Sequence, residues 1–335
     1  MKRILIILSI CLIAFLLGQF FIFSKINSTG NPTDGQYYEA GKRFYKIFSI
    51  KIPETLTFAG ENVPLEKFYV REGLDRELLV NSYWQSNSVL LLKRSFRYFP
   101  LIDSILIANK VPTDIKYIAL IESGLENIVS PAGAAGFWQF LKATGVSYGL
   151  EINQEVDERY NVEKATVAAC KYLKDAHARF NSWTAAAAAY NMGTDGLDAV
   201  MKSQKCNNYY DLYLNKETQR YVYRILAMKL IYQSPVNYGF YLRTTDMYPE
   251  IPAYSVVVDS AVASWPDFAK QNNSNYRILK ELNPWIIKYT LTNKENKKYK
   301  VLFPKPGYEN YSKLFSDIKQ DGSLFNDTLK VDQIR

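Results

Sequence analysis

The stretch from Lys110 to Leu141 constrains the fold of this chain more than any other part of its sequence. It starts as a helix, with Thr113 as the expected N-cap. Three apolar residues then recur at helical spacing: Ile115, Ile118 and Ala119. Glu122 takes the next position of this apolar stripe, where a carboxyl group loses hydration and its pKa rises. Such an acid can donate a proton, although a glutamate at the edge of the stripe would instead reach water or pair with an arginine.

A turn rich in small residues follows this helix. Gly124 is expected to end or loosen the helix, and residues 130–140 then read SPAGAAGFWQF. Glycine and alanine let the backbone pass close to another group. Trp138 offers a surface for stacking or for the core, and Gln139 offers a donor and an acceptor. This layout fits a sugar-binding site, but a tight turn between two core helices would have a similar sequence.

Apolar periodicity predicts the other main helices of this region. Residues 74–108 are expected to form two helices, and later helices are expected at Val162–Phe180, Trp183–Tyr190 and Glu217–Tyr232. Five consecutive alanines, at 185–189, indicate a helix that its neighbours approach closely on most faces, and therefore a central one.

Four motifs, in order, resemble the lytic transglycosylases of the bacterial cell wall. They are ALIESGLEN at 119–127, SPAGAAGFWQF at 130–140, AAYNMG at 188–193 and KETQRYVYRILA at 216–227. The resemblance runs from about Tyr83 to Phe240 and is strongest to the membrane-bound lytic murein transglycosylase D type, an SLT-domain family within the lysozyme-like superfamily. It implies a mainly α fold, with a lysozyme-like (goose-type) helical catalytic domain at residues 83–240.

The resemblance also implies roles for individual residues. Glu122 would be the catalytic residue. The residues implied to position the substrate are Ser130, Gln139, Tyr190, Asn191, Glu217 and Tyr221. From the residues alone two of these stay open, since Glu217 could pair with a cation and only hold the fold, and Tyr221 suits a core as well as a ligand site.

No second carboxylate is supported as a partner of Glu122. Ordinary glycosidases flank the scissile bond with two carboxylates, but Glu126 matches a variable position of the family and Asp157 is expected to cap a loop. The resemblance implies that Glu122 acts alone, first as acid and then as base. The muramic acid C6 hydroxyl then attacks C1, which gives a 1,6-anhydro sugar. Asn161 replaces an aspartate usual in the family, and we expect it to affect only local capping.

The first residues of the chain predict export. Lys2 and Arg3 precede an apolar run from Ile4 to Phe23 that is about long enough to cross a bilayer. Residues 1–24 are expected to be an uncleaved signal anchor or a cleaved signal peptide. Either alternative places the chain in the bacterial cell envelope, anchored in the membrane and facing the periplasm or released after cleavage. Residues 25–82 are expected to form a tether and an N-terminal cover.

The composition of the chain limits which cofactors, metals and partners we expect it to bind. The chain has one histidine, His177, among 335 residues, and it has no GxGxxG, P-loop or HExxH motif, so we expect no metal and no cofactor. A net charge of +8 fits an anionic membrane surface or wall polymer. The expected partners are peptidoglycan strands and the membrane, without nucleic acid, and the expected state is a monomer. Whether Cys170 and Cys206 pair is left open.

The pattern changes after Pro249. A strand, two helices and a strand are expected at Tyr254–Val258, Trp265–Gln271, Asn275–Leu282 and Lys298–Phe303. This order, with RILKELNPWI as its best piece, resembles a degenerate LysM module, a small α+β glycan-binding fold, at residues 250–305. Its Gly-rich strand signals are missing, so the module is either a glycan binder or a structural cap. Residues 306–335 are expected to be a polar tail.

Two functions compete with the transglycosylase interpretation. A hydrolase of the same fold, a lysozyme, would admit water and leave reducing ends. A non-catalytic protein that binds the cell wall would not depend on Glu122 for its function.

Overall fold

The structure, a computed structural model, describes residues 49–316. The expectations for residues 1–24, for the tether before residue 49 and for most of the C-terminal tail therefore lie outside the described residues. Within 49–316, none of the helices combines the length and the hydropathy needed to cross a bilayer.

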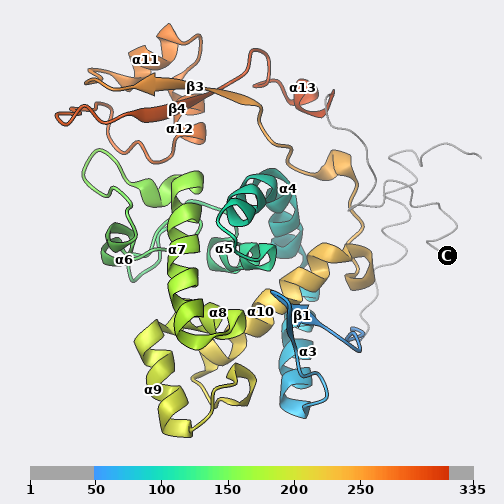
Figure 1. Ribbon diagram of the computed structural model, residues 1–335. Helices are drawn as coiled ribbons and strands as arrows, with labels where there is room; N and C mark the ends of the chain where they lie inside the picture. The colour runs from blue at the N-terminus through green and yellow to red at the C-terminus, as the bar shows by residue number, and fades with distance from the viewer. Residues whose placement is uncertain (1–48, 317–335) are drawn as a thin grey trace, which may run out of the picture. The chain divides into compact units, whose positions relative to one another are not determined.

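A helical domain forms the first and larger part of the described chain (Figure 1). Its main elements, in order, are β1 (Thr57–Phe58), β2 (Glu61–Asn62), α3 (Phe68–Tyr83), α4 (Gln85–Ala108), α5 (Lys116–Ser123), α6 (Lys142–Ser147), α7 (Val162–Phe180), α8 (Trp183–Met192), α9 (Thr194–Gln204) and α10 (Lys216–Gln233). The two helices predicted within residues 74–108 are α3 and α4, although α3 begins at Phe68, before the predicted start, and α7 has the predicted bounds. Short 3₁₀ turns connect several of these helices, among them Thr113–Ile115, Glu158–Tyr160 and Tyr209–Asp211.

Helix α8 lies in the core of this domain, as its alanines predict. Ala185 to Ala189 are each at most 1% exposed, and α8 packs against α7, α9 and α10. Because alanine has the smallest side chain apart from glycine, these neighbours approach the α8 backbone closely. Ser182 caps the helix by accepting a hydrogen bond from the Ala185 amide. The helix runs two residues beyond the predicted end, and it presents Tyr190 and Asn191 in its last turn.

The start of α5 differs from the prediction. Thr113 makes no capping hydrogen bond, and residues Thr113–Ile115 form a 3₁₀ turn before α5 begins at Lys116. The neighbouring Asp114 accepts a hydrogen bond from the Ala59 amide at 2.7 Å and pairs with Lys229 of α10 at 2.8 Å. These partners come from distant parts of the chain, and they tie the β1–β2 hairpin and α10 to the entry of α5.

The C-terminal module has its own small core. β3 (Ala253–Val258) pairs antiparallel with β4 (Tyr299–Pro304), with Val258 opposite Tyr299, and α11 (Trp265–Gln271) and α12 (Tyr276–Leu282) complete it. The short helix α13 (Tyr311–Ser316) follows β4. Both strands lie within one residue of their predicted bounds. Trp265, Leu279 and Phe303 are buried in its core. The module joins the helical domain by backbone hydrogen bonds, from Asp157 N–H to the Trp285 carbonyl and from Ile287 N–H to the Glu155 carbonyl.

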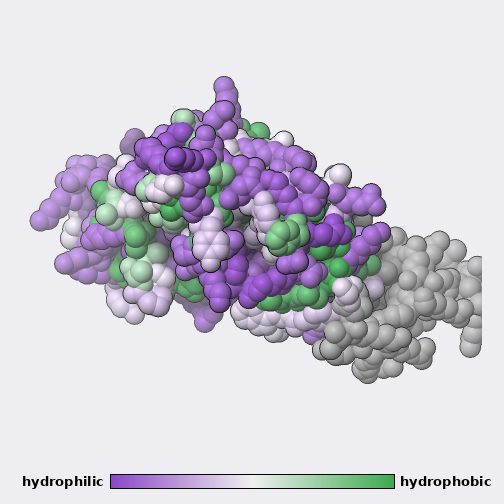
Figure 2. All heavy atoms as spheres, turned by 90° about the horizontal axis from the view of Figure 1, so that it is seen from below, coloured by the Kyte–Doolittle hydropathy of each residue, from purple (hydrophilic) through white to green (hydrophobic). Residues whose placement is uncertain are grey.

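Hydrophilic side chains cover most of the face seen in Figure 2, and apolar residues reach that surface only in small separate patches. Such scattered apolar residues are normal for a folded surface and mark no site by themselves.

Candidate active site

Glu122 lies in the last turn of α5 and is mostly buried. Gly124 ends the helix in a left-handed conformation with φ of 63°, which glycine adopts without strain. The Glu122 carboxylate accepts a hydrogen bond from the Tyr221 hydroxyl of α10 at 2.5 Å. Burial raises the pKa of Glu122, while the Tyr221 hydrogen bond and the positive charge of Arg224 lower it and the negative charge of Glu217 raises it. The desolvation cause is the largest, as the apolar stripe predicted.

Tyr221 joins the core to the carboxylate. The residue is 1% exposed, so its ring is buried in the core, and its hydroxyl donates a hydrogen bond to Glu122. Burial, followed by the charge of Glu122, raises the pKa of Tyr221 well above its usual range, so the hydroxyl stays protonated and donates. Arg224, one turn further along α10, has its guanidinium 5.6 Å from the centre of the Tyr221 ring. Sequence reasoning missed Arg224, although its i, i+3 spacing from Tyr221 is a usable signal.

Tyr190 approaches the same carboxylate from α8. Its hydroxyl donates to the Trp138 carbonyl at 2.6 Å. Burial raises the pKa of Tyr190 well above its usual range, and the charge of the nearby Glu122 raises it further. Trp138 is itself fixed, because its indole N–H donates to Thr166 of α7 at 2.9 Å. Glu122, Tyr190 and Tyr221 therefore form one group of side chains from three helices.

The turn after α5 is held rigidly beside this group. Ser123 donates to the Phe137 carbonyl at 2.9 Å and accepts a hydrogen bond from the Leu125 amide. Gly136 has φ of 77°, and a Cβ added there would lie 1.9 Å from the Arg159 carbonyl oxygen, so only glycine fits. Sequence reasoning named the small residues of this turn but not Ser123, which fastens the turn to α5.

Ser130 and Gln139 take part in the internal hydrogen bonds of the turn. The Ser130 hydroxyl accepts from the Ala134 amide at 3.1 Å. The Gln139 amide group donates to the carbonyls of Gly136 and Ile128, at 2.8 and 3.1 Å. Neither side chain has a hydrogen bond to Glu122 in the described part of the chain. Both lie on the segment that follows α5.

Asn191 lies in the last turn of α8, and Glu217 lies in the first turn of α10. The Asn191 side-chain oxygen accepts a hydrogen bond from the Thr218 hydroxyl at 2.8 Å. Glu217 is exposed in the first turn of α10, and its charge raises the pKa of both Glu122 and Arg220. Asn191 is thus locked to α10, whereas Glu217 acts on Glu122 through its charge.

The two other acids near the site have partners of their own. Glu126 pairs with Arg94 of α4 at 2.6 Å. Asp157 pairs with Arg159 at 2.7 Å and accepts from the Arg159 amide as the cap of a 3₁₀ turn, which confirms its predicted capping role. The Arg159 guanidinium also donates to the carbonyls of Gly133 and Phe140 and so supports the turn. Asn161 caps α7 by accepting from the Lys164 amide, as predicted.

Across residues 49–316, no group of three or more histidine, cysteine, aspartate or glutamate side chains is arranged to hold a metal ion. Cys170 and Cys206 are both free thiols.

Comparison with known proteins supports this reading of the chain. Residues 105–212 match the family described as Transglycosylase SLT domain, and residues 254–307 match the Soluble lytic transglycosylase C-terminal LysM-like domain. The chain is also similar to "Membrane-bound lytic murein transglycosylase D" from Escherichia coli strain K12 and from Escherichia coli O6:H1 strain CFT073. Each is 31% identical over 144 residues, which is 41% of this chain and 32% of the relative. The chain therefore matches about a third of the length of these relatives.

These matches confirm the expected resemblance. They also confirm the expected fold class, a mainly helical catalytic-type domain followed by a small α+β LysM-like module.

Proposed function

Because this chain carries a transglycosylase SLT domain followed by a LysM-like domain, we propose that it is a peptidoglycan lytic transglycosylase of the bacterial cell envelope. Its substrate would be the β-1,4 bond between N-acetylmuramic acid and N-acetylglucosamine in wall glycan strands. The observation that carries the proposal is the buried Glu122 carboxyl, whose pKa is raised by desolvation and whose position is fixed by the Tyr221 hydroxyl.

In the first step Glu122 acts as the general acid. Its proton passes to the glycosidic oxygen, the bond from that oxygen to C1 of N-acetylmuramic acid breaks, and an oxocarbenium-like centre forms at C1. A carboxyl kept protonated by desolvation is suited to this step. Tyr221 holds the carboxyl in position, because its ring is buried and its hydroxyl reaches only Glu122 among the described residues.

In the second step the same group acts as the base. The Glu122 carboxylate removes the proton from the C6 hydroxyl of the same sugar, and the C6 oxygen bonds to C1. The product is a 1,6-anhydro-N-acetylmuramic acid end, no water is consumed, and Glu122 is protonated again. One carboxylate is enough, and this agrees with Glu126 and Asp157 being paired with arginines.

The substrate contacts that we propose come from the segments around Glu122. Ser130 and Gln139 lie on the turn after α5, Tyr190 and Asn191 in the last turn of α8, and Glu217 in the first turn of α10. Each of these segments is fixed by hydrogen bonds described above, so the groove would be formed before substrate binds. The roles of the individual side chains are part of the proposal.

Mass spectrometry of purified peptidoglycan digested by the chain tests the proposal. We expect products with 1,6-anhydro ends, and we expect Glu122→Gln to lower their rate of formation by about 10²-fold or more. Glu126→Gln is the matched control, because it removes an acid one turn away that pairs with Arg94. Reducing ends would indicate a lysozyme-type hydrolase. An unchanged rate in Glu122→Gln would contradict the assignment of the acid, and wall binding without any cleavage would indicate a non-catalytic protein.

A further inference from the structure

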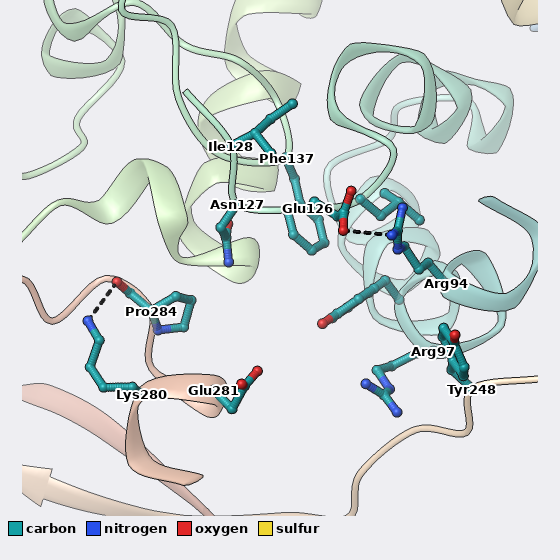
Figure 3. Close-up of a pocket in the computed structure, with 12 residues that line it drawn as sticks. Arg94, Arg97, Glu126, Asn127, Ile128, Phe137, Tyr248, Lys280, Glu281 and Pro284 are labelled. Carbon is teal, nitrogen blue, oxygen red and sulfur yellow. Dashed lines mark hydrogen bonds and ion pairs between the residues drawn. The ribbon is translucent and has the colours of Figure 1, made fainter. Parts of the chain in front are cut away.

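A cavity of about 550 Å³ lies between α4, the segment Leu125–Ile128 and α12 of the LysM-like domain (Figure 3). Glu122 does not line it, so the cavity is distinct from the catalytic carboxyl. The segment Leu125–Ile128 begins three residues after Glu122, however, and forms the wall nearest to the catalytic helix. A volume of this size is typical of sites for small ligands.

Arg97 offers this cavity an oriented cationic group. Its Nε donates to the Pro249 carbonyl at 2.8 Å, and its guanidinium lies 5.7 Å from the centre of the Tyr248 ring. These contacts hold the side chain, whereas its terminal nitrogens have no acceptor among residues 49–316. In Figure 3 they point into the open space. A guanidinium held in this way can bind a carboxylate through two parallel hydrogen bonds.

The other cations of the cavity wall already have partners. Arg94 donates to Glu126 at 2.6 Å and to the Gly124 carbonyl at 3.2 Å. Lys280 donates to the carbonyls of Pro284 and Ile286. Within the described chain, Arg97 is therefore the lining cation that remains for an incoming anion.

The opposite side of the cavity carries a carboxylate. Glu281 of α12 faces the same open space in Figure 3. Its partner is Arg277, and this pair is exposed, with 85% of the Arg277 side chain accessible. Exposed i, i+4 pairs contribute little stability, so Glu281 can take up an ammonium group instead. The Asn127 side chain also lines the cavity and has no hydrogen bond in the described residues.

We propose that this cavity binds a peptide that carries both a carboxylate, held by Arg97, and an ammonium group, held by Glu281. We assign this peptide to the peptide branches of the wall glycan strands. That assignment rests on the proposed function, whereas the charge pattern of the ligand rests on Arg97 and Glu281 alone. The protein would then recognise a glycan strand by its peptide as well as by the sugars that bind near Glu122.

Calorimetry with the full chain tests the binding directly. The probe is a synthetic peptide with a blocked N-terminus, N-acetyl-L-alanyl-γ-D-glutamyl-L-lysyl-D-alanyl-D-alanine, compared with forms that have an amidated C-terminus or an acetylated lysine. We expect Arg97→Gln and Glu281→Gln each to weaken binding of the probe by about 10-fold. The probe with an acetylated lysine should bind equally to Glu281→Gln and to the unaltered chain. Arg71→Gln, which removes an exposed cation from α3, is the control and should change nothing.

The variants also separate this proposal from the proposed function. Arg97→Gln should leave cleavage of peptide-free glycan strands unchanged and lower only the preference for strands that carry peptides, whereas Glu122→Gln should slow cleavage of both by about 10²-fold or more. Peptide binding without any cleavage would overturn the proposed function and leave the site intact. Unchanged probe affinity in both Arg97→Gln and Glu281→Gln would overturn the site. If Arg97→Gln fails to fold, Glu281→Gln decides the outcome, because it breaks only an exposed pair.

Discussion

The SLT domain and the LysM-like domain bury polar side chains in opposite ways. Asn283 of the LysM-like domain is 0% exposed, and its side chain donates to the carbonyls of Leu279 and Leu302 and accepts from the Leu302 amide, at 2.8, 2.8 and 2.7 Å. Glu122 of the SLT domain receives one described side-chain hydrogen bond, from Tyr221, and burial raises its pKa. Asn283 is satisfied within the fold, whereas Glu122 is not.

This difference indicates what each group is for. A buried polar group with a full set of partners specifies and stabilises one packing arrangement. A buried acid with a single partner destabilises the fold when it is ionised, and such groups concentrate at sites of chemistry. Asn283 fastens α12 to β4, and Glu122 remains available to a substrate.

The largest effect should come from Glu122→Gln, which would raise stability while removing activity. The folded-state pKa of Glu122 lies above its unfolded value, so its contribution to stability is fully present below the unfolded value and is lost as the pH rises through the folded value. Glutamine does not ionise and still accepts from Tyr221. Thermal unfolding should therefore show a gain for the variant at pH 8, of a few degrees, and little gain at pH 4. A loss of stability in this variant at pH 8 would contradict the contrast with Asn283, because Glu122 would then stabilise the fold as Asn283 does.

Asn283→Leu should have the opposite profile. It leaves the Leu302 amide and carbonyl without the Asn283 side chain as a partner, while the Leu279 carbonyl keeps the Asn283 N–H. We expect a loss of about 2–4 kcal/mol in the free energy of unfolding of the LysM-like domain. Hydrogen exchange of the β3 and β4 amides measures this loss. Asn275→Ala, which removes only the cap of α12, is the control and should cost about 1 kcal/mol. If both variants lost the same free energy of unfolding, the buried hydrogen bonds of Asn283 would stabilise the domain no more than a single helix cap does.

Tyr221→Phe should have an intermediate effect. It keeps the buried ring and removes the hydrogen bond that lowers the pKa of Glu122, so that pKa should rise further. We expect cleavage to slow by about 10-fold and the alkaline limb of the pH–rate profile to move to higher pH. The profile separates this role from a structural one, since lost packing alone would leave the limb in place.

The smallest effect should come from substitutions of Asn161, which contacts neither Glu122 nor Asn283. Its side chain accepts from the Lys164 amide at the start of α7. Asn161→Ala should cost about 1 kcal/mol, and Asn161→Asp, which keeps an oxygen that can accept from the Lys164 amide, should change stability by about 0.5 kcal/mol or less. Chemical denaturation measures both. A large change in cleavage with either variant would place Asn161 in the chemistry instead.

Local patterns were enough to predict most of the fold. Helical spacing placed α7 at Val162–Phe180 and α11 at Trp265–Gln271, because their apolar faces and caps are encoded within each segment. The predicted Thr113 cap was wrong, because Thr113 lies inside a 3₁₀ turn that precedes α5. The next residue of that turn, Asp114, has its partners at Ala59 and Lys229, far away in the sequence. A cap prediction cannot take such tertiary contacts into account.

In the candidate site, too, only the features that depend on neighbours within one helix could be predicted. The apolar stripe around Glu122 predicted its raised pKa from neighbours on one helix. The hydrogen bond from Tyr221 joins residues 99 positions apart, and the charge of Arg224 reaches Glu122 from the same distant helix. The cavity with Arg97 and Glu281 joins segments even further apart, and no periodic pattern links them. Long-range proximity of this kind is visible only once the chain is folded.

Titration of the Glu122 carboxyl tests the central claim most directly. In a chain labelled with ¹³C at its glutamate carboxyl groups, the resonance missing from the Glu122→Gln spectrum belongs to Glu122. Its midpoint should lie above 4.5, the ordinary value for a glutamate, and should rise further in Tyr221→Phe. A midpoint at or below 4.5 would contradict the account, because desolvation would then not be the dominant influence on the Glu122 carboxyl.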